Sequence, residues 1–124
     1  MRCLLIIAHG SRRAASNDEV LQLAARVRVR PGLAFDTVAT GFLELAEPTV
    51  ATALQKCIEL GAREVVVFPY FLAAGRHVVS DIPAQIAPVQ TRYPDVNITV
   101  LPHLGAAAAL PEVILSLADA RTSA

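Results

Sequence analysis

Three histidines and one glutamate lie just past stretches of this sequence that predict β-strands. These residues are His9, Glu44, His77 and His103. The strands are expected at residues 3–8, 35–40, 65–68 and 96–101. In an open α/β sheet, ligands bind beyond the carboxyl ends of the strands. Neutral imidazole binds cobalt, nickel, iron and zinc, and a set of two or three histidines with one carboxylate leaves positions open for a substrate. The pattern therefore predicts an open metal-handling site at one edge of a sheet.

Each of these residues also has a plain structural interpretation. A histidine that follows a strand often serves in a loop or cap, but the shared edge favours a ligand role for His9 and His77. His103 follows Pro102, where it can simply solvate a turn. Glu44 lies among apolar neighbours, so a half-buried carboxylate there would need a polar partner. The residues alone leave the roles of His103 and Glu44 open.

Strands that alternate with helical segments predict the fold class. Apolar residues recur at helical spacing between the expected strands and again at residues 111–120. The strand at residues 3–8 is a continuous apolar run, which is typical of a parallel strand covered on both faces. We therefore expect an α/β fold: a four-stranded parallel sheet with helices on both faces, of the flavodoxin-like or a related doubly wound type.

Capping and breaking residues suggest where the helices begin and end. Ser16 is expected to cap the first helix as part of a capping box, and Glu47-Pro48 is expected to open the second, which Gly61 ends. Ser80 is a candidate cap for the third helix, and Pro88 should kink or end it. The alanine run at residues 106–109 is expected to be helical.

Length and composition exclude several classes of protein. The 124 residues fit one domain, 1–124, and the hydrophobic fraction of 54% with a mean hydropathy of +0.49 excludes a disordered chain. Eleven basic residues balance eleven acidic ones, so we expect no nucleic-acid partner. The apolar runs are too short for a membrane span, which leaves the apolar surplus for a subunit interface.

The N-terminal segment and the cysteines indicate the compartment. The apolar stretch at residues 4–8 is too short for a signal peptide, so a cytoplasmic location is expected. Cys3 and Cys57 form no CxxC motif, and we expect buried, inert thiols rather than a disulfide. The sequence also lacks a GxSxG nucleophile elbow, a Walker A loop and a GxGxxG motif.

Three segments closely resemble a known family. They are Ala8-His9-Gly10-Ser11-Arg12, the stretch FLELAEP at residues 42–48, and the stretch VFPYFLAAGRHVVSDIP at residues 67–83. In order and spacing they are similar to the small class II chelatases, the sirohydrochlorin cobaltochelatases and ferrochelatases. The resemblance runs from residue 3 to about residue 105. Beyond it, Leu104-Gly105 leads into alanines where the family often has His-Pro, which leaves His103 without a counterpart.

The resemblance implies a reaction and a set of site residues. The reaction is insertion of a divalent metal into sirohydrochlorin, without ATP and without an organic cofactor, on the way to cobalamin or siroheme. Cobalt is the first choice of metal, with Fe²⁺ or Ni²⁺ as alternatives. The matching positions make His9 and His77 the metal ligands, with Glu44 assisting. The resemblance also implies a homodimer.

Sirohydrochlorin is a tetrapyrrole edged with carboxylates, and cationic or amide groups near the histidines suit it. Arg12 and Arg76 flank the two key histidines and can pair with carboxylates, although a structural role is an equal alternative. Backbone amides at Gly10 and Ser11 are further candidate donors. A non-catalytic carrier of metal or tetrapyrrole with the same fold is the alternative to an enzyme.

Overall fold

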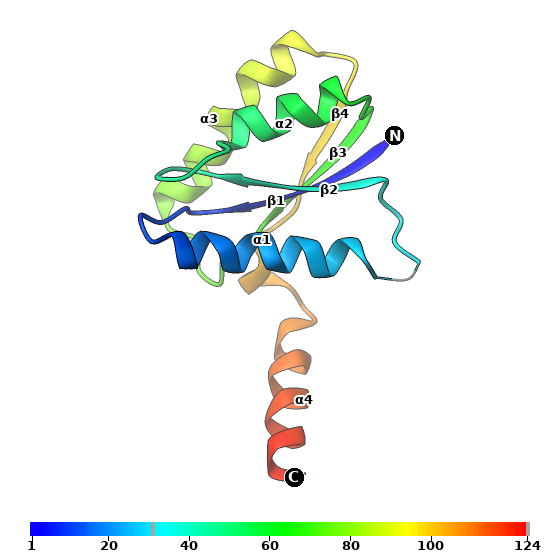
Figure 1. Cartoon of the computed structure of the whole chain (residues 1–124). Coiled ribbons are helices and arrows are strands. Elements are labelled where there is room, and N and C mark those ends of the chain that lie inside the picture. Colours follow the sequence, from blue (N-terminus) through cyan, green and yellow to red (C-terminus); the bar gives the residue numbers. More distant parts are fainter. Residues whose placement is uncertain (31, 124) are drawn as a thin grey trace.

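The chain folds into a four-stranded sheet with helices on both sides (Figure 1). This computed structural model describes residues 1–30 and 32–123, and the side chains of His77 and of residues 121–123 lie outside what it describes. The elements in chain order are β1 (Arg2–Ala8), α1 (Ala14–Arg28), β2 (Thr37–Phe42), α2 (Val50–Glu59), β3 (Glu64–Pro69), α3 (Arg76–Arg92), β4 (Asn97–Val100), the 3₁₀ helix η1 (Leu104–Ala106) and α4 (Leu110–Ser123).

The sheet has the strand order β2-β1-β3-β4, and all three pairings are parallel. The expected α/β fold with a parallel sheet is confirmed. The inner strand β1 pairs on both sides, with Ile6 opposite Thr40 of β2 and Phe68 of β3. Because all strands run the same way, their carboxyl ends lie at one edge of the sheet.

Helices cover the two faces of the sheet unequally. Residues of α2 and α3, including Leu54 and Ile82, pack with Leu5 of β1 in one large core. On the other face, Ala24 of α1 packs with Ile6 and with Val38 of β2 in a smaller core. Figure 1 shows α2 and α3 on one side of the sheet and α1 on the other. The expected inner residues of α3, among them Ile82 and Val89, are buried.

Three helices begin earlier or later than the sequence predicts. Ser16 lies inside α1, and Ser80 lies inside α3, whose N-cap is Gly75. The helix α2 does not open at Glu47-Pro48, which forms a cis peptide bond in the preceding loop. The hydroxyl of Thr49 caps α2 instead, accepting a hydrogen bond from the amide of Thr52 at 3.2 Å. Gly61, with φ of +115°, follows the end of α2 as expected.

The prediction that Pro88 ends α3 is wrong. This helix contains Pro83 and Pro88 and continues to Arg92. Each proline removes the amide donor for one carbonyl group of the helix, that of Val79 or of Ala84, and all four of these residues are exposed. Burial of the apolar face of α3 therefore outweighs the weak helix propensity of proline.

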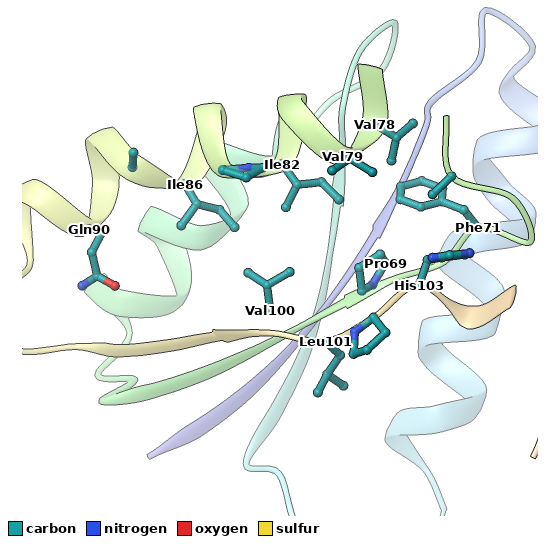
Figure 2. A pocket seen from close by; sticks show the side chains of 14 residues that line it. Pro69, Phe71, Val78, Val79, Ile82, Ile86, Gln90, Val100, Leu101 and His103 are labelled. Carbon is teal, nitrogen blue, oxygen red and sulfur yellow. The ribbon is translucent and has the colours of Figure 1, made fainter. Parts of the chain in front are cut away.

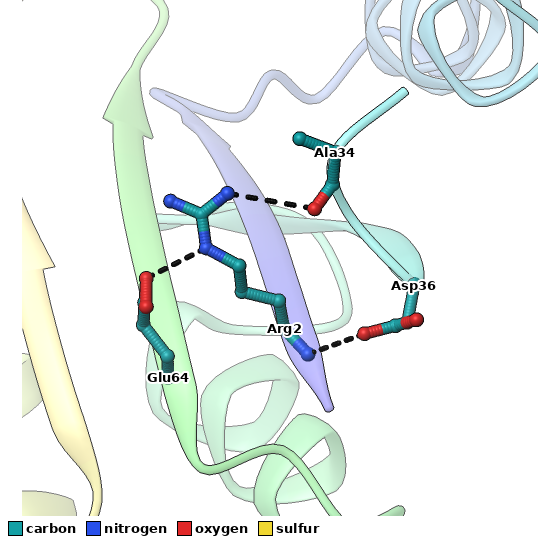
Figure 3. A network of polar contacts seen from close by, with 4 residues as sticks. All are labelled: Arg2, Ala34, Asp36 and Glu64. Carbon is teal, nitrogen blue, oxygen red and sulfur yellow. Dashed lines mark hydrogen bonds and ion pairs between the residues drawn. The ribbon is translucent and has the colours of Figure 1, made fainter. Parts of the chain in front are cut away.

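A polar network ties the strands together at the amino-terminal edge of the sheet (Figure 3). The Arg2 side chain donates from Nε to Glu64 at 2.7 Å and lies over the ring of Phe35, 4.5 Å from its centroid. The amide of Arg2 donates to Asp36 at 2.7 Å. Since Arg2 and Glu64 are partly exposed, this ion pair contributes only about 0–1 kcal/mol.

The two cysteines are free thiols in the larger core, as expected. Cys3 of β1 and Cys57 of α2 are buried, with their sulfur atoms 2.8 Å apart. The hydrogen bond to Cys57 and burial raise the pKa of the Cys3 thiol. The Cys3 thiol is therefore kept protonated and inaccessible in the folded chain.

The C-terminal segment departs from the layered arrangement. Only Ala106 of the alanine run at residues 106–109 is helical, at the end of η1. The helix α4 follows and extends away from the sheet (Figure 1). No helix among the described residues is long and apolar enough to cross a membrane.

The core packing predicts the effect of truncating a leucine in α2. Leu54 is fully buried, so Leu54→Ala should lower the free energy of unfolding by about 2–5 kcal/mol through lost contacts and a cavity. Urea denaturation would measure the change. The control is Leu60→Ala at the end of the same helix, where the side chain is 61% exposed and the expected change is within about 0.5 kcal/mol. Equal losses in the two variants would contradict this description of the core.

Candidate functional site

The loops after β1 and β2 are joined by backbone hydrogen bonds that continue the strand pairing. The amide of Leu43 donates to the carbonyl of Ala8 at 2.9 Å, and the amide of Glu44 donates to the carbonyl of His9 at 3.0 Å. The backbones of His9 and Glu44 are therefore direct neighbours. The structure thus brings together two of the residues that the sequence analysis singled out.

Gly10 makes this close approach possible. It has φ of +90°, and a Cβ placed on it would lie 1.8 Å from the carbonyl oxygen of Glu44. No side chain fits in that space, and L-residues rarely adopt this backbone conformation. The loop of Glu44 also holds Leu45 at φ of +64°, a left-handed conformation that non-glycine residues seldom adopt and that is common at functional sites.

The loops after β3 and β4 are joined in the same way. The amide of Gly105 donates to the carbonyl of Phe71 at 2.9 Å, and a Cβ on Gly105 would lie 1.7 Å from the carbonyl oxygen of Leu72. The ring of Phe71 in turn contacts the imidazole of His9, with ring centroids 4.6 Å apart and planes inclined at 50°. Phe71 therefore links the two pairs of loops.

Phe71 is the site residue that sequence reasoning undervalued. Its ring is 5% exposed and packs in the larger core, whereas the neighbouring Tyr70 and Leu72 are exposed. No feature of the sequence separates these three residues, because all are apolar or aromatic and lie in one loop. A fixed aromatic surface beside His9 restricts the orientation of an otherwise exposed imidazole.

The side chains of His9 and Glu44 are both exposed. Glu44 is therefore exposed in spite of its apolar sequence neighbours, and the case of a half-buried carboxylate does not arise. An exposed carboxylate needs no polar partner within the fold. It is free to accept a proton from, or to bind, a ligand at this edge.

His77 is the second residue of α3, the helix that begins after the β3 loop. Its side chain lies outside the described part of the chain, so the predicted pairing of the His9 and His77 imidazoles remains a prediction. Among the side chains that the structure does describe, no three histidine, cysteine, aspartate or glutamate residues form a group that could hold a metal ion.

The residues expected to bind anionic groups differ in what they can donate. Arg12 and Arg76 are exposed, and neither guanidinium group has a hydrogen-bond or ion-pair partner among the described side chains. The Ser11 amide is not the free donor that the sequence analysis expected, because it donates to Oδ1 of Asn17 at 2.9 Å. The Ser11 hydroxyl accepts from the amide of Arg13 at 3.0 Å and keeps its own proton to donate.

His103 lines an apolar groove of about 440 Å³ beside the site (Figure 2). The groove runs between α3 and β4 and ends at Phe71, whose ring also contacts His9. Gln90 and His103 are the polar side chains among the fourteen that line it. Figure 2 shows Val100 pointing into this groove toward α3, whereas Leu101 points to the other side of the strand.

Comparison with known proteins identifies the family. The chain matches the CbiX family over residues 3–120. It belongs to this family. A solved structure described as a putative cobalamin biosynthesis CbiX protein from Marinobacter aquaeolei superimposes with a TM-score of 0.81 at 28% sequence identity, covering 99% of this chain and 98% of that one.

Curated relatives of this CbiX-family chain carry two activity names. The sirohydrochlorin cobaltochelatase of Methanococcus maripaludis is 39% identical over 83 residues, 67% of this chain and 56% of that protein. The chloroplastic sirohydrochlorin ferrochelatase of Arabidopsis thaliana is 33% identical over 102 residues, 82% of this chain and 44% of that protein. The chain thus matches about half the length of these curated relatives.

The contact at Gly10 predicts the effect of adding one methyl group. Gly10→Ala should lower the free energy of unfolding by about 2–5 kcal/mol, because the left-handed backbone costs 1–2 kcal/mol and crowding of the Glu44 carbonyl costs 1–3 kcal/mol. Gly32→Ala is the matched control, since Gly32 has φ of +73° but open space around it. Only the backbone cost of about 1–2 kcal/mol should appear there. Denaturation curves that shift equally for both variants would show that the contact with Glu44 is not tight.

Proposed function

We propose that this CbiX-family chain is a sirohydrochlorin chelatase that inserts a divalent metal, with Co²⁺ as the first choice, and needs no ATP. The observation that carries the proposal is the backbone pairing of His9 with Glu44 at the edge of the sheet. That pairing fixes the backbones of His9 and Glu44 as neighbours, and the side chains of both residues are exposed. The names of the curated relatives support sirohydrochlorin as the substrate.

His9 and His77 are the proposed metal ligands. Imidazole suits cobalt, iron and nickel alike, so the donor set does not choose among them. The cobaltochelatase names of the archaeal relatives favour cobalt and therefore cobalamin synthesis. The ferrochelatase name of the plant relative supports the second candidate, insertion of Fe²⁺ for siroheme.

The proposed chemistry follows from the charge balance of metallation. One M²⁺ ion replaces two pyrrole N–H protons, so the site must hold the metal, release it to the ring nitrogens and accept protons. A site with few protein ligands suits transfer, because the macrocycle can complete and then take over the coordination. Glu44, which is exposed and whose backbone is hydrogen-bonded to that of His9, is the proposed proton acceptor.

The carboxylates at the edge of sirohydrochlorin need cationic or hydrogen-bonding partners. Arg12 and Arg76 are the proposed partners, because their exposed guanidinium groups can form paired hydrogen bonds with carboxylates. The hydroxyl of Ser11 and the backbone of Gly10 are proposed as further contacts next to His9. No organic cofactor is part of this proposal.

Residues 1–124 are proposed to act as one chelatase domain within a cytoplasmic homodimer. The exposed apolar side chains of α4 support association with a second copy. The two free, buried thiols are consistent with a reducing compartment. The balanced charge supports the absence of a nucleic-acid partner.

The proposed activity is tested by the initial rate of metal insertion into sirohydrochlorin, followed by absorbance. Co²⁺, Fe²⁺ and Ni²⁺ would be compared in parallel, each with and without the protein. A rate well above the protein-free control establishes a chelatase, and the fastest metal points to cobalamin or siroheme. Binding of the ring or metal with no gain in rate would instead indicate a carrier.

The ligand assignment predicts a clear order among the histidine variants. His9→Ala and His77→Ala should each slow insertion by at least about 100-fold, since the loss of even an outer-shell partner of a metal ligand costs 10–100-fold. His103→Ala, which removes the histidine of the neighbouring groove, should change the rate by less than about threefold. Circular dichroism would confirm that each variant folds. Full activity in both His9→Ala and His77→Ala would rule out the assignment.

A further inference from the structure

Leu43, the residue before Glu44, is held by three different parts of the fold. Its amide donates to the carbonyl of Ala8 at the end of β1. Its side chain is partly buried and packs against the larger core. Its carbonyl accepts a hydrogen bond from Nε2 of Gln85, a partly buried residue of α3, at 2.9 Å. Leu43 therefore joins β1, the core and α3 directly next to the proposed proton acceptor.

The hydrogen bond from Gln85 reaches this loop from a helix that is distant in the sequence. Gln85 and Leu43 are 42 positions apart, and α3 is the helix that has His77 as its second residue. Among the described side chains of α3, that of Gln85 is the one that donates to a loop at the site edge of the sheet. The contact therefore ties the helix that begins with one proposed site residue to the loop that carries another.

The loop after β2 has a conformation that depends on its surroundings. Leu45, which follows Glu44, has φ of +64°, and a non-glycine residue keeps this left-handed conformation only where neighbouring contacts impose it. The Leu45 side chain is 53% exposed, so its own packing contributes little to holding the turn. The backbone contacts of Leu43 and Glu44 must therefore hold it.

A second glutamine of α3 makes the same type of contact away from the site. Nε2 of Gln90 donates to the carbonyl of Tyr93 at 3.1 Å and to that of Val96 at 2.9 Å, in the turn that leads to β4. Gln85 and Gln90 are both partly buried, and both donate to carbonyl groups of loops. Gln90 therefore provides a matched reference, a contact of the same chemistry with no proposed site residue beside its acceptors.

We infer that Gln85 is a positioning residue for metal insertion, because it fixes the loop of Glu44 relative to α3. This role rests on the proposed function, in which Glu44 accepts protons and His77 binds the metal. In this scheme Gln85 acts through the Leu43 carbonyl and does not itself contact the metal or the ring. Since a displacement of about 1 Å can cost 100-fold in rate, loss of this hydrogen bond should slow the reaction without abolishing the fold.

Gln85→Met tests the inference, because methionine has nearly the length and helix propensity of glutamine but no donor. The kcat of metal insertion should fall about tenfold or more, and KM for sirohydrochlorin should change less than about twofold. Gln90→Met, which also loses its hydrogen bonds to a loop, should keep kcat within about twofold of the wild type. Equal kcat values in the two variants would overturn the inference.

A double-mutant cycle shows whether Gln85 acts through Glu44. In a Glu44→Gln chain, which lacks the proposed proton acceptor, Gln85→Met should slow the residual insertion by less than about a further twofold. A general loss of stability would instead slow insertion by the same factor in both backgrounds. That second result would contradict a positioning role.

Hydrogen–deuterium exchange tests the positioning without any enzymatic activity. The amides of Leu43 and Glu44, which are bonded to carbonyl groups of β1 and its loop, should exchange at least about fivefold faster in Gln85→Met than in the wild type. Their exchange should be unchanged in Gln90→Met. Unchanged protection of both amides in Gln85→Met would overturn the inference. A wild-type chain without insertion activity would refute the proposed function, while the exchange rates would still decide whether Gln85 holds this loop.

Discussion

Parallel pairing between β1 and β2 continues past the last residues of both strands, and the candidate site depends on this continuation. The hydrogen bond between Glu44 and His9 requires two loops to approach at backbone distance, which is possible only because Gly10 has no side chain. The same arrangement recurs between Phe71 and Gly105 at the other half of the edge. The exposed candidate residues are thus positioned by backbone contacts rather than by a buried polar network.

The residues that stabilise the fold lie in a different part of the molecule from the candidate site residues. The core between the sheet and the helices α2 and α3 is apolar, and its two thiols are buried. The strand-end edge carries the exposed His9, Glu44 and Arg12, together with the left-handed Leu45. A well-packed sheet can hold loops in conformations that would not persist in a free peptide. Exposed side chains at such an edge are suited to bind a metal ion and then release it to another ligand.

Much of the fold could be predicted from the sequence, because continuous apolar runs and helical periodicity report burial directly. Helix starts could not, since Ser16 and Ser80 are good caps that tertiary packing places inside helices. The shared edge of His9 and Glu44 followed from parallel topology, but the exposure of Glu44 depends on the local turn of its loop. The contact of Phe71 with His9 joins residues 62 positions apart in the chain and has no local signature.

Imidazoles from the β1 loop and from the start of α3 are proposed to bind one metal ion. X-ray absorption at the cobalt edge of the Co²⁺-loaded chain reports these ligands, with His9→Ala and His77→Ala measured alongside. Scattering from two imidazole rings is expected in the wild type and from one ring in each variant. A cobalt ion surrounded by oxygen ligands alone, or a spectrum that neither variant changes, would contradict this assignment.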